Sequence, residues 1–382
     1  MRILIVGAGI GGLTLAGLLK QRGFQPEVIE QKKDIFRPGY MLGIYPLGSR
    51  ILYGPGLIEA FLEHSVPSDT YAMCTGAGEV IHQFSLKQVF APWGPNRSCT
   101  RGTLLRVLME GCHDLPLRMG LGVAAIEQLG ETVQVTFSDG SSGEYDLVVG
   151  ADGLNSTVRK LLWLPEEYSV FDTGWGGWLW WTDDPRLQAG TAMEFWGAGH
   201  MLGIYPTEYK FGAFAIMPAE KGKTRPYPGL RSGIRQAMAE LVKAYPVVFE
   251  QIPQDEQSDM QYWPLADGRV EGWFKKRVVL LGDAAAGFLP TSDAGASMAM
   301  ESAAVLADEL TRTDVYHLEW ALQLYQKRRE PRVIAAQDDS RNLARQMFVK
   351  SAISSRLRNY LLQRYSLKSL SENIERIFET PI

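Results

Sequence analysis

The stretch MRILIVGAGIGGLTLAGLLKQRGFQPEVIE, residues 1–30, decides the fold. It begins with a short apolar run, residues 2–6, which is typical of a buried strand, and a segment with helical spacing follows over residues 13–22. A second strand is expected over residues 24–29, with Glu30 at its end. Strand, glycine-rich turn, helix and strand in this order form a βαβ unit with the dinucleotide-binding fingerprint.

The glycines of this turn have different roles in the fingerprint. Gly7 permits the tight turn, Gly9 lets the backbone approach a pyrophosphate, and Gly12 lets the helix pack closely on the strand. The start of the helix offers free N–H groups and the positive end of its dipole to the phosphates. Glu30 is placed to accept hydrogen bonds from the ribose hydroxyls. A glycine-rich turn that binds nothing is the alternative.

The composition is that of an ordinary globular protein, with 46% hydrophobic and 21% charged residues among 382. The net charge of −4 gives no reason to expect nucleic acid as a partner. Three cysteines without a CxxC motif suggest free thiols in a reducing compartment. We expect a cytoplasmic protein, since neither a signal peptide nor a membrane span is recognisable. No metal site is expected, because no Cys/His cluster has ligand spacing.

Patterning divides the chain into three parts. Residues 1–70, 97–165 and 268–330 hold the buried strands and long helices of a discontinuous α/β domain of Rossmann type. Residues 71–96 and 166–267 are rich in Trp, Gly and Pro with period-2 patterns, which predicts an inserted antiparallel sheet, interrupted by one helix near residues 230–245. Residues 331–382 are expected to be helical.

The C-terminal helical part is basic. From residue 341 to residue 370 it carries Lys and Arg and no acidic residue. With the interleaved apolar side chains, this run is compatible with weak contact to an anionic membrane surface. A helical face packed on the protein's own body, or a dimer contact, is the favoured alternative.

Two further turns join the fingerprint in one pattern. Asp152-Gly153 follows a buried strand at residues 145–150, and Gly282-Asp283 follows another at residues 277–281. In this order and at these separations, the three turns resemble those of the class A flavin-dependent monooxygenases, the family of para-hydroxybenzoate hydroxylase. The resemblance extends from residue 1 to about residue 330.

The resemblance implies a non-covalently bound FAD. It also implies NADPH or NADH as a co-substrate that docks transiently, since the chain has no second GxGxxG. By the same resemblance, the following residues are expected to bind FAD: Gly7, Ala8, Gly9, Ile10, Gly11, Gly12, Glu30, Gln31, Gly43, Arg101, Val123, Asp152, Gly153, Asp283, Pro290, Gly295, Ala296 and Ser297.

Three of these residues have roles that can be stated physically. Asp283 follows a strand, which places its carboxylate at the sheet edge, within reach of a ribityl hydroxyl. Asp152 resembles the residue that braces the FAD side of the fold and is implicated in nicotinamide use, and Arg101 resembles one that lies against the ribityl chain or pyrophosphate. Each residue also has an explanation that needs no cofactor. Asp283 could be the acidic residue of a helix-initiating turn, Asp152 could stabilise a strand-to-helix turn, and Arg101 could simply lie on the surface.

The loop and helix after Asp283 should meet the flavin ring. A helix expected from about residue 294 would aim its N-terminal dipole at the pyrimidine end, which favours the negative charge of reduced flavin. The chain departs from the family here. Ala286 stands where His is frequent, Ser292-Asp293-Ala294-Gly295 replaces the usual Gly-Gln-Gly loop, and Ser302 stands where an acid is common. These changes put the fine tuning of oxygen reactivity in doubt.

The central strands supply aromatic candidates for substrate contact: Trp178, Trp180, Trp196 and Tyr205. One face of the sheet should cover the flavin and leave an apolar pocket for a planar or lipophilic molecule, although each of these residues could instead be ordinary sheet core. The scarcity of Lys and Arg on these strands argues against a small carboxylated substrate. No side chain is singled out as catalytic.

We therefore expect a monomeric or homodimeric FAD-dependent monooxygenase. It would use NAD(P)H and O₂, through a C4a-hydroperoxyflavin, to hydroxylate or epoxidise a small aromatic or lipophilic molecule. An FAD-dependent reductase of double bonds and a flavin halogenase remain alternatives, although residues 178–183 do not complete the halogenase Trp-x-Trp-x-Ile-Pro motif. A non-enzymatic binding protein of the same fold is a third alternative.

Overall fold

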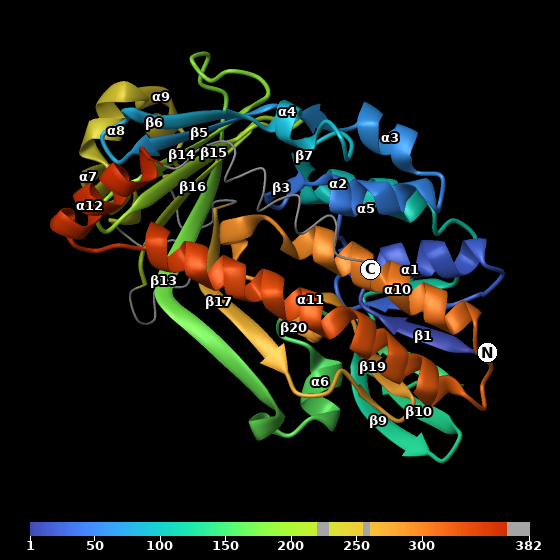
Figure 1. The fold of residues 1–382 in the computed structure, drawn as a ribbon. Helices are drawn as coiled ribbons and strands as arrows, with labels where there is room; N and C mark the ends of the chain where they lie inside the picture. The colour runs from blue at the N-terminus through green and yellow to red at the C-terminus, as the bar shows by residue number, and fades with distance from the viewer. Residues whose placement is uncertain (220–228, 255–259, 365–382) are drawn as a thin grey trace.

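A computed structural model describes residues 1–219, 229–254 and 260–364. Two large sheets form its framework, one of six strands and one of eight, and two three-stranded sheets accompany them (Figure 1). Helices α10 (Gly295–Thr311) and α11 (Leu318–Met347) run past both large sheets. The mixed α/β fold predicted from the sequence is confirmed.

The six-stranded sheet is built around the N-terminal strand. Its order is β18 (Phe274–Lys275), β19 (Val278–Leu280), β12 (Leu147–Gly150), β1 (Ile3–Val6), β2 (Glu27–Glu30) and β8 (Leu117–Met119). All neighbours are parallel except the edge pair β18–β19. Every residue of β1, β12 and β19 is buried, which explains why these strands are continuous apolar runs.

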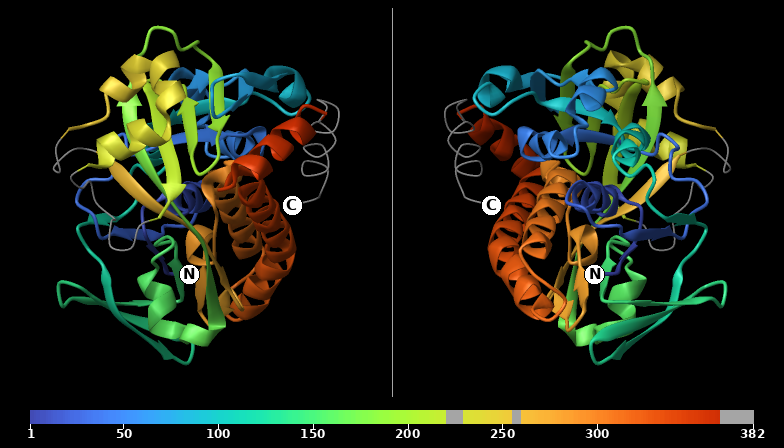
Figure 2. Two further views of the ribbon diagram at one scale, coloured as in Figure 1. Left: turned by 90° about the vertical axis from the view of Figure 1, so that its left-hand side faces the viewer. Right: turned by 90° about the vertical axis from the view of Figure 1, so that its right-hand side faces the viewer.

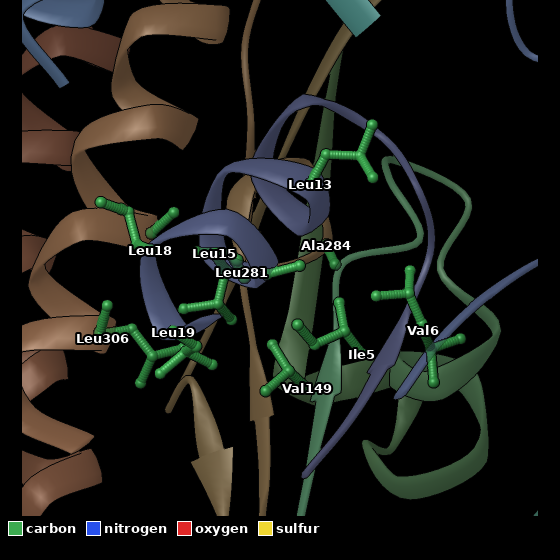
Figure 3. Packing of buried hydrophobic residues seen from close by; sticks show 14 of the residues in the cluster. Ile5, Val6, Leu13, Leu15, Leu18, Leu19, Val149, Leu281, Ala284 and Leu306 are labelled. Carbon is green, nitrogen blue, oxygen red and sulfur yellow. The ribbon is translucent and has the colours of Figure 1, made fainter. Parts of the chain in front are cut away.

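Helix α1 (Ile10–Gln21) covers one face of this sheet. Its leucines pack over Ile5 and Val149 of the sheet, and Leu306 of α10 lies beside them (Figure 3). A Cβ placed on Gly12 would lie 2.0 Å from the carbonyl oxygen of Gly7, so only glycine allows helix and turn to approach this closely.

The eight-stranded sheet carries most of the central aromatic residues. Its order is β20 (Ala286–Gly287), β17 (Gln261–Val270), β13 (Tyr168–Thr182), β16 (Phe211–Pro218), β15 (Met201–Tyr205), β14 (Thr191–Trp196), β5 (Thr70–Thr75) and β6 (Val80–Ser85). The pairs are antiparallel apart from β14 and β5, which are parallel. The sheet thus combines the period-2 segments recognised in the sequence.

Three short helices cover one face of this sheet: α7 (Leu230–Ala237), α8 (Ala239–Ala244) and α9 (Pro246–Glu250). The single helix expected near residues 230–245 is therefore wrong. Met238 leaves the helical region, with φ −119° and ψ 37°, and separates α7 from α8. Tyr245 precedes Pro246, and a residue before proline disfavours the helical conformation.

Helix α11 links the two large sheets and lies beside α10 (Figure 2). Glu301 of α10 is fully buried and pairs with Arg332 and Arg329 of α11, at 3.0 and 3.2 Å. Further along α11, Arg341 forms a 2.6 Å ion pair with Asp267 of β17, and Gln337 donates to the carbonyl of Gly287 in β20. These contacts fix the eight-stranded sheet relative to α10.

The basic C-terminal run makes contacts within the chain. Arg341 pairs with Asp267, and Arg358 of α12 (Ala352–Leu362) is buried and donates to the carbonyl oxygen of Trp196 at 2.6 Å. At these two positions the structure shows a helical face packed on the protein's own body. Residues 365–382 of the expected helical segment lie outside the described residues.

Smaller elements complete the framework: β3 (Met41–Ile44), α2 (Pro46–Ser49), η1 (Arg50–Tyr53), α3 (Ile58–Glu63), β4 (Val66–Pro67), α4 (Leu86–Phe90), β7 (Arg97–Thr100), α5 (Arg101–Glu110), β9 (Val123–Leu129), β10 (Thr132–Phe137), β11 (Ser142–Tyr145), α6 (Thr157–Leu162), η2 (Pro165–Glu167), η3 (Gly282–Ala284) and η4 (Pro290–Ser292). In the part of the chain that the structure describes, no helix has the length and hydropathy needed to cross a bilayer.

Candidate active site

Three turns that are far apart in the sequence leave the six-stranded sheet at the same edge. Val6 is in register with Gly150, and Gly150 with Leu280, so the parallel strands β1, β12 and β19 end side by side. A Cβ on Gly7 would lie 2.5 Å from the carbonyl oxygen of Ala151, which shows that the first two turns touch. The carboxyl edge of such a sheet is where doubly wound folds bind ligands.

The fingerprint turn leaves open space at one glycine. At Gly9, the nearest atom to an added Cβ is the carbonyl oxygen of Ala151, at 3.9 Å. Residues 9–11 keep accessible surface, whereas the residues before and after them are buried. The helix α1 that follows has no side-chain cap and no acidic residue in its first turn. Its first N–H groups therefore face a space that suits a phosphate. These features fit the dinucleotide part of FAD.

Glu30 lies directly beside this turn. One oxygen of its carboxylate accepts a hydrogen bond from the backbone N–H of Ala8 at 3.0 Å, and the other accepts one from the backbone N–H of Lys32 at 2.9 Å. Gly122 comes close to Gln31, since a Cβ on it would lie 3.8 Å from Cβ of Gln31. Val123, the next residue, is buried at the start of β9. The residues Glu30, Gln31 and Val123, all predicted to contact FAD, thus lie close together beside the fingerprint turn.

Asp152 is engaged by its own helix. Its carboxylate accepts hydrogen bonds from the backbone N–H groups of Thr157 at 2.6 Å and Val158 at 3.1 Å, and from the hydroxyl of Ser156 at 2.5 Å. This arrangement caps α6 and corresponds to the strand-to-helix turn considered from the sequence. Gly153 has φ +78° and no atom within 4 Å of an added Cβ, so the backbone at this turn stays accessible.

Asp283 is arranged in the opposite way. No described residue donates a hydrogen bond to its carboxylate. The residue keeps accessible surface, but many protein atoms surround it and desolvate the carboxylate. It lines a pocket together with Trp273, Phe288 and Gly295. Desolvation in this pocket raises the pKa of Asp283 from 3.8 to about 6. A free acceptor in a pocket suits a ligand hydroxyl.

Arg101 approaches the same region from the other side. It is the first residue of α5, and its backbone N–H donates to the carbonyl oxygen of Tyr40 at 2.7 Å. The charges of Arg101 and Asp283 both act on the Tyr40 hydroxyl, whose pKa is raised chiefly by burial. Tyr40 therefore lies near both predicted FAD contacts, so that Arg101 and Asp283 belong to one region of the structure.

The start of α10 is only partly as expected. The helix begins at Gly295 without a side-chain cap, and Gly295 and Ala296 keep accessible surface. Ser297 is fully buried instead. Its hydroxyl packs against Gly48 of α2: the Oγ atom of Ser297 lies 2.7 Å from the position that a Cβ on Gly48 would take. The Ser297 side chain thus lies on the packed face of α10, and its expected part in FAD binding stays a prediction. Pro290 is exposed at the start of η4.

Asp293 lies two residues before α10 in a left-handed conformation, with φ +50°. Its carboxylate lies over Gly43 of β3: a Cβ on Gly43 would be only 3.2 Å from Oδ2 of Asp293. The absence of a side chain at Gly43 therefore allows the carboxylate to lie here. Burial, and secondly the charge of Glu194, raise the pKa of Asp293 from 3.8 to about 7.

Glu194 of β14 is a functional candidate that the sequence interpretation missed. Its side chain is 6% exposed and accepts hydrogen bonds from the hydroxyl of Tyr71 at 2.6 Å, from the indole N–H of Trp196 at 2.8 Å and from the hydroxyl of Tyr205. Burial raises its pKa, and the three hydrogen bonds oppose that rise. The sequence contained one signal for this residue: Glu194 is the single acid among the apolar residues of the expected strand AMEFW, residues 192–196.

Trp178 and Trp180 lie on the opposite face of the sheet from Trp196 and Tyr205. The indole N–H of Trp180 donates to the carbonyl of Val248 in α9 at 2.8 Å, and both tryptophans belong to the core under α7–α9. Trp196 belongs instead to the core that faces α11. The grouping of all four residues in one substrate pocket is therefore corrected, because the register of β13 against β16 sends Trp178 and Trp180 to the other side.

A βαβ nucleotide site with these two further turns, joined to a large sheet that carries its own aromatic face, defines the class A flavoprotein monooxygenases. The chain belongs to the family described as "FAD binding domain", whose model matches residues 1–340. It is 30% identical to 6-hydroxynicotinate 3-monooxygenase of Pseudomonas fluorescens, over 88% of this chain and 89% of that one. It is 28% identical to the putative FAD-dependent monooxygenase YetM of Bacillus subtilis, over 90% and 93%.

Solved structures agree on the fold. A point variant of HpxO from Klebsiella pneumoniae, in complex with FAD, superimposes with a TM-score of 0.89 at 24% identity and covers 100% of this chain and 99% of that one. 2-Methyl-3-hydroxypyridine-5-carboxylic acid oxygenase superimposes with a TM-score of 0.76 at 20% identity, over 95% and 96%. The chain is thus an FAD-dependent monooxygenase, as the three turns predicted.

Proposed function

We propose that the enzyme hydroxylates a small aromatic or heterocyclic ring with NAD(P)H and O₂, and that the ring binds on the Glu194 face of the eight-stranded sheet. The observation that carries this proposal is the position of Asp293. It lies two residues before α10, at the predicted cofactor edge, and its charge acts on Tyr71 and Tyr205 of the sheet. The predicted cofactor cleft and this aromatic face are therefore neighbours.

The names of two relatives support a ring substrate. These enzymes are named for 6-hydroxynicotinate and for 3-amino-4-hydroxybenzoate, which are both substituted six-membered rings that also carry a carboxylate. The names support the ring alone, because the acids on the sheet face of this chain are expected to set it apart from these relatives at the carboxylate. A planar ring would find aromatic partners here, since Tyr205 stacks on Phe214 with ring centroids 5.7 Å apart.

The chain's own residues would bind and orient FAD. The start of α1 would hold the pyrophosphate, Glu30 the ribose hydroxyls and Asp283 a ribityl hydroxyl, while the uncapped start of α10 would face the ring. Bound FAD would supply the electron transfer from NAD(P)H and the activation of O₂. In this proposal residues 1–70, 97–165 and 268–330 bind the cofactor, residues 71–96 and 166–267 the substrate, and residues 331–382 support both.

Oxygen labelling of the purified holoenzyme tests this function. We expect NAD(P)H oxidation to accelerate with a suitable hydroxylated ring, and ¹⁸O₂ to place one labelled oxygen atom in the product. A product reduced at a double bond, formed without oxygen consumption, would identify a reductase instead. A halogenated product formed only with halide would identify a halogenase.

A further inference from the structure

We propose that Glu194 and Asp293 determine which rings the enzyme accepts, by favouring a substrate with a protonated nitrogen and disfavouring one with a carboxylate. The inference rests on the proposed function and specifies its substrate class. Neither acid is among the residues expected to bind FAD.

Glu194 is built as a fixed acceptor. The indole N–H of Trp196 can only donate, so the oxygen that it shares with the hydroxyl of Tyr71 must accept. The hydroxyl of Tyr205 donates to the other oxygen. These donors favour the ionised form against the rise in pKa that burial causes, and they fix the direction in which the remaining lone pairs point. Glu194 thus places an acid on an otherwise apolar sheet face.

Asp293, the second acid, differs from the glutamate because its own carboxylate has no hydrogen-bond donor among the described residues. Asp293 keeps accessible surface, and its carboxylate lies over Gly43 of β3. Strand β3 packs on this sheet face, since a Cβ on Gly212, the residue opposite Tyr205, would lie 2.9 Å from Sδ of Met41.

Tyr45, at the entry to α2, is influenced by both acids. A group that lies between Tyr45, Tyr71 and Tyr205 would therefore meet Asp293 as a free acceptor and Glu194 as a second negative charge.

The same region offers no cation to balance these charges. Strands β5, β14, β15 and β16, which are fully described, contain no Lys or Arg. Arg358 lies over the ring of Trp196 at 5.6 Å, but its guanidinium is used by the carbonyl oxygens of Trp196 and Met347 and by Asn359. A substrate carboxylate would add negative charge beside two acids, of which Glu194 is buried and Asp293 partly buried, whereas a protonated nitrogen would neutralise part of their charge.

A matched series of ligands can test this with the FAD-loaded protein. We would compare 4-hydroxybenzylamine, 4-hydroxybenzyl alcohol and 4-hydroxybenzoate, which differ mainly in charge, and measure Kd from the change in flavin absorbance at pH 7.5. For the wild-type protein we expect the amine to bind at least tenfold more tightly than the carboxylate, with the alcohol between them.

Substitution should remove the preference. We expect Glu194→Gln and Asp293→Asn each to reduce the amine-to-carboxylate ratio several-fold, and the double variant to bring it near one while binding of the neutral alcohol is retained. Asp183→Asn is the matched control, because Asp183 is an exposed acid that pairs with Lys210 at 2.9 Å. It should leave the ratio unchanged.

Equal or tighter binding of the carboxylate by the wild-type protein would overturn the proposal, and so would a failure of all three ligands to bind. An unchanged ratio in the double variant would do the same. The proposed function would survive these results if any ring substrate acquires oxygen from ¹⁸O₂, so the two failures are distinguishable.

Discussion

The contrast between Gly9 and Gly12 tests whether the fingerprint turn faces a ligand. A methyl group at Gly12 would lie 2.0 Å from the Gly7 carbonyl oxygen, which is a backbone atom that no side-chain rotation can move, so α1 has to move away from the sheet. Overpacking costs about 1–3 kcal/mol, and a backbone clash belongs at or above the upper end of that range. Gly12→Ala should therefore destabilise the protein by about 3 kcal/mol or more.

Gly9→Ala should behave differently. The added methyl group has its nearest neighbour at 3.9 Å, and Gly9 has an ordinary φ of −79°, so only the small N-cap preference for glycine is lost, about 1 kcal/mol or less. The same methyl group would occupy the space in which the pyrophosphate meets the first N–H groups of α1. Losing one or two charge-assisted hydrogen bonds, at about 1.5–3 kcal/mol each, should weaken FAD binding about 100-fold.

Two measurements on each variant separate these effects. Urea unfolding of the apo-protein gives the stability, and titration of FAD, followed by the quenching of its fluorescence, gives Kd. We expect Gly12→Ala to lose stability and Gly9→Ala to lose affinity at nearly normal stability. A Gly9→Ala protein that binds FAD like the wild type would refute the placement of the pyrophosphate at this turn.

Three other substitutions probe the site and its support. In the folded protein Asp293 has a pKa of about 7 against 3.8, so the contribution of this group to stability should fall as the pH rises from about 4 to about 7, by an amount on the order of 4 kcal/mol. In urea unfolding of the apo-protein, Asp293→Asn should accordingly be more stable than the wild type at pH 8 and only slightly more stable at pH 4. An equal gain in stability at both pH values would contradict the burial of this carboxyl. Trp180→Phe removes the indole donor to Val248 and should cost about 1–3 kcal/mol with an unchanged Kd for FAD, whereas a weaker Kd would place Trp180 in the site. Asp152→Ala removes the acceptor of two N–H groups of α6, although the Ser156 hydroxyl still accepts from the N–H of Arg159, and should lower the unfolding free energy by about 1–2 kcal/mol; unchanged stability would show that the Asp152 hydrogen bonds contribute nothing.

Local patterns predicted the cofactor half of the fold well. The strand, turn and helix of residues 1–30 are contiguous, and their spacing alone indicates a βαβ unit. The convergence of the turns at Gly7, Asp152 and Asp283 also follows from local information, because each comes after a buried strand and parallel strands share one carboxyl edge.

The substrate face could not be predicted in the same way. Alternation shows that Trp178 and Trp180 share a face, but which face is decided by the pairing of β13 with β16 and β17, far away in the sequence. Glu194 was overlooked because its partners Tyr71 and Tyr205 come from two other strands. The burial of Ser297 likewise depends on Gly48, about 250 residues earlier in the chain, which no local pattern reveals.

The interleaved strand order has a consequence for how this enzyme could acquire new substrates. The eight-stranded sheet takes strands from residues 70–85, 168–218, 261–270 and 286–287, and its edge strand β20 begins only three residues after Asp283. No single cut would release the aromatic sheet as a transferable block, and a graft between family members would need several simultaneous crossovers. Evolution and protein engineering should therefore alter specificity here by individual replacements on the sheet face, with the chain order left intact.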